Sequence, residues 1–190
     1  MENDRTLDPE ESLELISKVI QDNKDNLKQN SFYFLLWGFL VGIACLLHYF
    51  LVVSEISFPP YIAWPVLMVA GGIISGVKGY SDSKRVGYET YTGMFTKNLW
   101  IGLGISLFIV LFLSSQMGVQ PVGLILMISG AGTLITGLNI KFNPLILGGI
   151  VLFIGAIATV FVPGVEVLLL CAGALLLGYI IPGLMLRNAK

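Results

Sequence analysis

The sequence predicts an all-α integral membrane protein: a six-helix bundle built as three helical hairpins, with an N-terminal amphipathic helix in the cytoplasm. Two observations predict this fold class. Hydrophobic residues make up 55% of the 190 residues and charged residues only 12%, whereas about 25% of a soluble domain is charged. In addition, all 11 Lys and Arg residues fall on one side of a chain threaded as six spans. Because basic residues stay on the cytoplasmic side, both ends of the chain are expected there.

Residues 1–30 are expected to form the cytosolic helix. Pro9 suits a first helical position and Glu11 completes a capping box with Asp8. Apolar side chains then recur on one helical face, at Leu13, Ile16, Ile20 and Leu27. No Gly or Pro follows Pro9 until Gly38, so the helix can continue into the first span, and residues 30–31 are the best place for a bend.

Residues 31–190 are expected to form the transmembrane domain. They contain six apolar segments, and each approaches the ~20 residues that a membrane-spanning helix needs. The spans are placed at about 32–53, 61–80, 98–115, 121–140, 144–161 and 165–186. The longest connection, 81–97, lies on the cytoplasmic side. Pro182 falls inside the last span, which predicts a kink or an early helix end at Ile180 and Ile181.

The second, fourth and sixth spans share the pattern Ala-Gly-x4-Gly. Its glycines are Gly71 and Gly76, Gly132 and Gly137, and Gly173 and Gly178. Small residues let helix backbones approach closely in lipid, so these glycines are predicted to lie at helix-packing contacts. Two interpretations stay open: the hairpins are copies of one unit, or the matches arise by chance in a chain with 22 Gly.

The sequence contains no motif for catalysis, for a metal or for another cofactor. The interiors of the predicted spans hold no Asp or Glu, and His48 is the only histidine. Cys45 and Cys171 form no Cys-x2-Cys pair, so both are expected to be small packing residues. Lys78, near the cytoplasmic boundary of the second span, is expected to extend to the interface. A non-enzymatic protein is therefore predicted.

Two cytoplasmic features favour contact with a partner. The apolar stripe of the N-terminal helix needs a cover outside the membrane, and Lys84 and Arg85 lie in the 81–97 connection. The leading hypothesis is a scaffold or sensor that engages a cytosolic protein through both features. The alternative is a small oligomeric transporter or channel. Besides the lipid bilayer, a second copy of the chain is a candidate partner, and no direct contact with nucleic acid is expected.

Four segments resemble an uncharacterised family of small bacterial six-span membrane proteins with an N-terminal cytosolic helix. They are ESLELI at 11–16, SFYFLLWG at 31–38, KFNPLILGGI at 141–150 and GYIIPG at 178–183. The resemblance covers nearly the whole chain and implies a multi-pass protein of the bacterial cytoplasmic (inner) membrane. It implies no activity and no functional residue. The neighbourhood of small winged-helix regulators in that family would suit a docking role.

Overall fold

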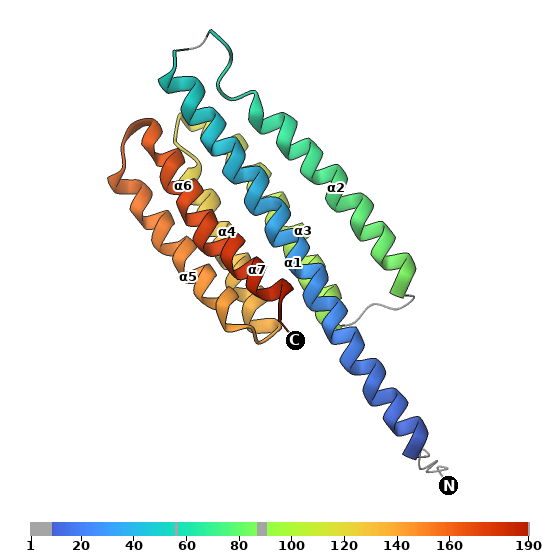
Figure 1. The fold of residues 1–190 in the computed structure, drawn as a ribbon. Coiled ribbons are helices and arrows are strands. Elements are labelled where there is room, and N and C mark those ends of the chain that lie inside the picture. Colours follow the sequence, from blue (N-terminus) through green and yellow to red (C-terminus); the bar gives the residue numbers. More distant parts are fainter. Residues whose placement is uncertain (1–8, 56, 87–90, 190) are drawn as a thin grey trace.

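The computed structural model describes the chain apart from residues 1–8, 56, 87–90 and 190. For residues 9–29, 83, 85 and 86 it describes only the backbone. The described residues form an all-helical bundle (Figure 1). Its helices are α1 (Pro9–Val53), α2 (Ala63–Val86), α3 (Tyr91–Met117), α4 (Val122–Asn139), α5 (Asn143–Ala158), α6 (Val167–Leu175) and α7 (Ile181–Arg187). A π-helical segment, Leu176–Ile180, joins α6 to α7, and short 3₁₀ turns cover Thr159–Phe161 and Gly164–Glu166.

α1 is one helix of 45 residues, and it continues through residues 30–31 without interruption. The bend considered at that point is therefore absent. At about 1.5 Å per residue, a helix of this length exceeds the thickness of a bilayer core, which is about 30 Å. Figure 1 shows the excess: the N-terminal part of α1 extends beyond the ends of the other helices.

Five helical stretches of the described chain are long and apolar enough to cross a membrane. They are Asn30–Val53, Tyr91–Met117, Val122–Asn139, Asn143–Phe161 and Gly164–Arg187. α2 is not among them, and its C-terminal part carries Lys78, Asp82, Lys84 and Arg85. These charges lower its hydropathy, although α2 lies alongside α1 (Figure 1).

The predicted 81–97 connection needs correction. α2 continues to Val86 and α3 begins at Tyr91, so most of 81–97 is helical. The third span is predicted to begin at Asn98, which is about two turns after the observed start of α3 at Tyr91. Polar and charged residues within the ends of both helices caused the error, because they resemble a loop in composition.

The centre of the bundle is built from α1, α4, α5 and the stretch from α6 to α7. α2 packs mainly on α1, and α3 mainly on α4. The buried core includes Leu126 of α4, Leu145 and Leu152 of α5, and Leu186 of α7, all with exposures of 0%. α2 and α3 are therefore peripheral helices that turn apolar side chains outward, such as Val77 and Phe108.

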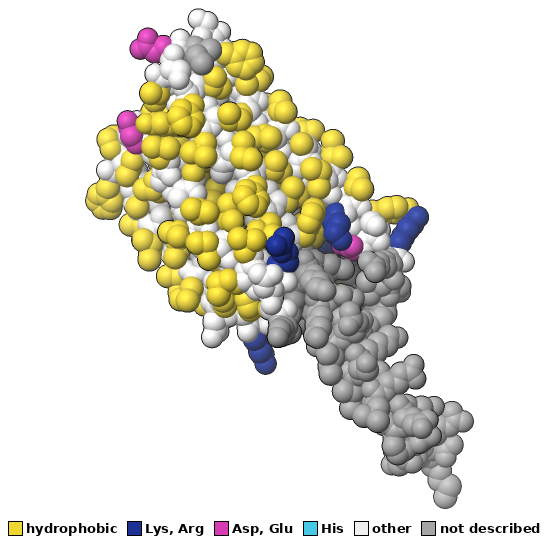
Figure 2. All heavy atoms as spheres, viewed as in Figure 1, with side chains coloured by type: hydrophobic (Ala, Val, Ile, Leu, Met, Phe, Trp, Pro, Cys, Tyr) yellow, Lys and Arg dark blue, Asp and Glu magenta, His cyan; other side chains and the backbone are white. Residues whose placement is uncertain are grey.

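The bundle has two ends of different charge, with a hydrophobic surface between them (Figure 2). The basic end contains the described Lys and Arg side chains, namely Lys78, Lys84, Lys97, Lys141 and Arg187. The opposite, acidic end contains Glu55 and Glu166. The N-terminal extension of α1 and the end of α7 both lie at the basic end (Figure 1).

Glycines allow α4 and α5 to pack backbone against backbone. A Cβ added at Gly137 of α4 would lie 2.7 Å from the backbone nitrogen of Ile146. A Cβ added at Gly149 of α5 would likewise lie 2.7 Å from the backbone nitrogen of Leu134. Real Cβ atoms do not approach a backbone so closely, so any side chain here would push the helices apart.

The π-helical segment meets α5 in the same way. A Cβ at Gly148 would lie 2.5 Å from the carbonyl oxygen of Gly178, and a Cβ at Gly178 would lie 2.6 Å from Leu152 Cγ. Pro182 lacks an N–H and cannot donate to the Gly178 carbonyl four residues earlier, which disturbs the α-helical pattern. The predicted irregularity near Ile180 is confirmed, as a π-helical segment instead of a helix end.

The first two hairpins share a packing motif. Gly71 of α2 faces Trp37 and Leu40 of α1: an added Cβ would lie 2.6 Å from Leu40 Cδ1 and 3.2 Å from the Trp37 ring. Gly132 of α4 faces Trp100 and Leu103 of α3 with the corresponding distances 2.9 Å to the ring and 2.6 Å to Leu103 Cδ1. In both pairs of helices, the Trp and Leu of a Trp-x2-Leu sequence therefore pack against the glycine of the Ala-Gly pair in the next helix.

The other glycines of the repeat differ among themselves. Gly137 and Gly178 lie at the close contacts with α5 described above. Gly76 and Gly173 do not lie at a close contact, because an added Cβ at either would meet no atom within 4 Å. Gly173 thus lacks the contact with a Trp-x2-Leu sequence that Gly71 and Gly132 make.

These contacts predict opposite effects for two similar substitutions. Gly137→Ala should lower the thermal unfolding temperature of the detergent-solubilised protein, because overpacking against the backbone of Ile146 costs about 1–3 kcal/mol. Gly173→Ala should leave it unchanged or raise it, because the position is open and Ala favours a helix by about 1 kcal/mol. Equal melting temperatures for the two variants would contradict this packing.

Candidate functional site

The candidate site is the basic end, where α1 leaves the bundle. Four residues predicted to contact a partner, Leu13, Ile16, Ile20 and Leu27, belong to the helical N-terminal part of α1. Their side chains lie outside the described residues, so their placement on one face follows from helical periodicity. The structure contributes the position of this backbone, which extends beyond the other helices (Figure 1).

Lys84 lies at the C-terminal end of α2, on the same end of the bundle. Its side chain is exposed, and Nζ lies 4.6 Å from the centroid of the Tyr80 ring, which is a cation–π contact. The side chain of Arg85 lies outside the described residues. Tyr80 is 65% exposed and Tyr91, at the start of α3, is 83% exposed. The basic end therefore presents exposed lysine and tyrosine side chains.

Lys78 has a partner that the sequence did not reveal. Its Nζ forms an ion pair with Oδ1 of Asp82, one turn further along α2. Nζ also lies 5.8 Å from the ring centroid of Phe32 on α1. The pair depends on the length of the helix, because α2 continues past residue 80 and brings Asp82 onto the same face.

The Asp82 side chain is the less accessible partner of the pair. It is 16% exposed, whereas that of Lys78 is 37% exposed. Its Oδ2 atom is buried and has no hydrogen-bond partner among the side chains and backbone that the structure describes. Lys78 Nζ is thus the cation that compensates this carboxylate.

A row of polar contacts joins α3 to α4 inside the bundle. Asn139 Nδ2 donates to Thr96 Oγ1 at 3.3 Å, near the basic end. Trp100 Nε1 donates to Thr136 Oγ1 at 3.2 Å, further inside. Thr136 is fully buried. These bonds fix α3 on α4, because an unpaired donor in lipid has no water to bond.

The hydroxyl of Tyr179 continues this row from the π-helical segment. Tyr179 is 4% exposed, and its hydroxyl lies near the side chains of Ser129 and Thr133. Thr133 Oγ1 also donates to the Ser129 carbonyl at 2.7 Å. These α4 hydroxyls, which a pore would have to expose, are buried and paired instead.

An aromatic cluster links α1 to the same region. The rings of Phe34 on α1, Trp100 on α3 and Tyr179 meet edge to face, with centroids 5.3–6.4 Å apart. One turn along α1, a Cβ at Gly38 would lie 3.1 Å from Tyr179 Cβ. α1 is thus packed directly against the π-helical segment.

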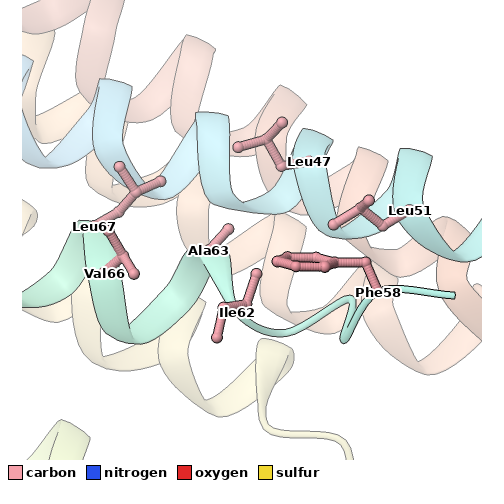
Figure 3. A pocket seen from close by; sticks show the side chains of 7 residues that line it. All are labelled: Leu47, Leu51, Phe58, Ile62, Ala63, Val66 and Leu67. Carbon is pink, nitrogen blue, oxygen red and sulfur yellow. The ribbon is translucent and has the colours of Figure 1, made fainter. Parts of the chain in front are cut away.

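At the acidic end, α1 and α2 are joined by His48. Its Nδ1 accepts a hydrogen bond of 3.1 Å from Trp64 Nε1. The only histidine of the chain therefore has a partner on α2. An apolar groove of about 450 Å³ lies beside it, between the same helices (Figure 3). Its lining residues are Leu47, Leu51, Phe58, Ile62, Ala63, Val66 and Leu67.

A larger groove of about 1090 Å³ lies at the acidic ends of α4 and α5, lined by residues such as Gly123, Met127 and Phe153. The residues that line the first groove are all apolar, whereas Gln120 and Thr159 are among those that line the second. The first groove therefore suits a hydrocarbon chain. Among the residues that the structure describes, no group of three or more His, Cys, Asp or Glu side chains is arranged to hold a metal ion.

The structure also places the two cysteines in one region of the core. Cys45 of α1 and Cys171 of α6 are both buried and belong to the same hydrophobic cluster. No spacing rule could reveal this pair, because the residues belong to the first and last spans.

Comparison of the chain with models of protein families, with curated proteins and with solved structures finds no match. Its function must therefore be inferred from the geometry of the basic end and from the packing of α1.

The Lys78–Asp82 pair predicts an asymmetric response to mutation. Lys78→Met should destabilise the protein by roughly 1–3 kcal/mol, because it leaves a buried carboxylate uncompensated. Asp82→Asn should cost less, about 0.5 kcal/mol, because the more exposed lysine can still reach water. Thermal unfolding in detergent measures both.

The double variant Lys78→Met/Asp82→Asn serves as the control for that pair. It should be more stable than Lys78→Met alone, because the buried charge is removed with its partner. A double variant whose loss equals the sum of the two single losses would show that the two side chains do not interact.

Proposed function

We propose that the protein is a non-enzymatic scaffold or sensor of a bacterial cytoplasmic membrane, and that it engages a cytosolic protein at its basic end. The observation that carries the proposal is α1 itself. A single helix, Pro9–Val53, contains both a membrane span and an extension outside the bundle. The extension carries the apolar stripe at Leu13, Ile16, Ile20 and Leu27.

The packing of α1 supports a sensor as well as a tether. α1 contacts α2, α6, α7 and the π-helical segment. Phe34 and Gly38 lie against Tyr179 in the middle of these contacts. A rearrangement within the bundle would therefore move the extension, because no loop or hinge separates it from the membrane span.

The proposed topology has six spans with the basic end in the cytoplasm. α2 is the sixth span, since its apolar part packs antiparallel along α1 and returns the chain to the basic end. Lys84 and the other basic side chains then stay on the cytoplasmic side, as the positive-inside rule requires. Both termini are cytoplasmic in this arrangement.

Charge favours a protein partner over the membrane surface for the extension. Its first turns carry Glu10, Glu11 and Glu14, whereas helices that lie on anionic membranes are rich in Lys and Arg on their polar face. An apolar stripe on a helix is a common mode of protein recognition.

The alternative, a small oligomeric transporter or channel, has weaker support. Thr133 and Thr136 are fully buried in one copy, so a polar path would require these helices to separate. Solute flux into liposomes that contain only the purified protein would favour this alternative over the scaffold.

The topology predicts the location of inserted reporters. A reporter that works only in the cytoplasm should be active when it is placed after residue 141 or at the C-terminus. A reporter that works only outside the cytoplasm should be active when it is placed at Glu55 or Glu166. Paired enzyme fusions that fluoresce or hydrolyse substrate on one side of the membrane measure this. A five-span chain would place the two ends on opposite sides and contradict the proposal.

The docking surface predicts face-selective cross-linking in intact cells. A photoreactive phenylalanine analogue at Ile16 or Ile20 should form an adduct with a soluble cytosolic protein, because both residues lie on the apolar stripe. The matched positions Lys18 and Asp22 lie on the opposite face and should give little adduct.

Two observations decide the outcome: the identity of the cross-linked protein and the helix face on which the photoreactive residue lies. Equal yields from the two faces would exclude a specific docking stripe. Adducts from Ile16 with a second copy of the chain alone would indicate self-association instead of partner binding.

A further inference from the structure

The larger groove, at the acidic ends of α4 and α5, is apolar inside and polar at its mouth. Its volume of about 1090 Å³ is close to the upper end of the range for ligand pockets, which is about 300–1,000 Å³. Most of the residues that line it are apolar. The polar ones lie at the mouth, because Gln120 precedes α4 and Thr159 follows α5. This distribution suits an amphiphile, with a polar head group and an apolar chain.

The apolar part of the groove extends from the mouth into the membrane-spanning part of both helices. Met127 lies about one and a half turns after the start of α4, and Phe153 lies about one and a half turns before the end of α5. This distance is about 8 Å along the helix axes, roughly half of one leaflet in a hydrocarbon core of about 30 Å. The groove can therefore hold the first part of an acyl chain.

The mouth offers hydrogen-bond acceptors. A Cβ added at Gly123 would lie 2.5 Å from Thr159 Oγ1 and 3.3 Å from the carbonyl oxygen of Ala156, so the missing side chain leaves space beside both oxygens. Thr159 Oγ1 donates its proton to the Ala156 carbonyl at 2.7 Å, and both oxygens can then only accept from a ligand. α5 also ends here, at Ala158, and a helix C-terminus carries partial negative charge. A ligand group at this point must therefore be a hydrogen-bond donor.

A carboxylate lies beside the same mouth. Gly164 lines the groove, and a Cβ added there would lie 2.7 Å from Glu166 Oε2. The side chain of Glu166 is exposed. The described Lys and Arg side chains lie at the opposite end of the bundle (Figure 2), so none of them neutralises this charge. The mouth therefore favours a cationic head group.

We propose that this groove binds a phospholipid whose head group carries a primary ammonium, phosphatidylethanolamine. An alkylammonium has three N–H donors for the acceptors at the mouth, and its charge complements the Glu166 carboxylate. One acyl chain lies along the apolar side chains of Leu124, Met127 and Phe153. A quaternary ammonium would bring charge without N–H donors, and an anionic head group without an amine would bring neither. The proposed topology decides only the leaflet, which is the outer one.

Native mass spectrometry of the delipidated full chain in detergent tests the head group. The protein is titrated with phosphatidylethanolamine, phosphatidylcholine and phosphatidylglycerol that share the same acyl chains. We expect phosphatidylethanolamine to bind most tightly. Glu166→Gln should raise its Kd by about threefold, the size expected for the loss of an exposed charge pair. Glu55→Gln is the matched control, because Glu55 lies at the same end but does not line the groove, and it should leave the Kd unchanged.

Two tryptophan variants of α5 test the groove itself. Ile157 lines the groove and is 65% exposed, whereas Ile154 is 60% exposed on the same helix and does not line it. Ile157→Trp should fill part of the groove and raise the Kd about tenfold, as expected when about two CH₂ groups of the chain lose their burial. Ile154→Trp should leave the Kd unchanged. Both side chains face outward, so both variants should fold with the wild-type melting temperature.

Three results would overturn the inference. The first is an equal Kd for the three phospholipids, which would refute recognition of the ammonium. The second is an equal effect of Glu166→Gln and Glu55→Gln, which would refute the carboxylate as its partner. The third is an equal effect of the two tryptophan variants, which would place the lipid outside the groove. The experiment contains no cytosolic protein, so its failure would leave the proposed docking at the basic end unaffected.

Discussion

Close backbone contact between α5 and its neighbours is the constraint on which the rest of the bundle depends. Lipid is as apolar as a leucine side chain, so helices in a membrane gain little from burying apolar surface and associate through tight packing and hydrogen bonds. Gly137 and Gly149 bring α4 and α5 together, and Gly148 admits the carbonyl of Gly178. That last contact positions the π-helical segment and with it Tyr179, whose hydroxyl and ring reach α4, α3 and α1.

α1 connects these contacts to the basic end. Along one uninterrupted helix, Cys45 meets α6, Gly38 and Phe34 meet the π-helical segment, and the first residues extend outside the bundle. A two-helix hairpin alone would not give this arrangement, since α1 is central while α2, its hairpin partner, is peripheral. The mechanical link between the bundle and the N-terminal extension is therefore a property of how α6, the π-helical segment and α7 pack on α1.

The sequence predicts the helical class, the sidedness of charge and the irregularity near Pro182, because each depends on local composition or on one residue's covalent chemistry. It does not predict the side-chain contacts that depend on where a helix ends or on packing between distant parts of the chain. Lys78 forms its ion pair with Asp82 only because α2 continues past residue 80. Cys45 and Cys171 belong to the same core cluster only because α1 and α6 pack together. Similarly, the Ala-Gly-x4-Gly pattern cannot show which glycines contact a neighbour: Gly71 does and Gly173 does not.

The difference between Gly71 and Gly173 also bears on how the bundle is organised. In the first two hairpins, Trp37 and Trp100 occupy the same place relative to the following helix, so a common packing unit explains both. The third hairpin has no such tryptophan. It has instead the π-helical segment, and its returning half, α6 to α7, packs along α1. The third hairpin thus departs from the shared unit at the residues that hold the central helix.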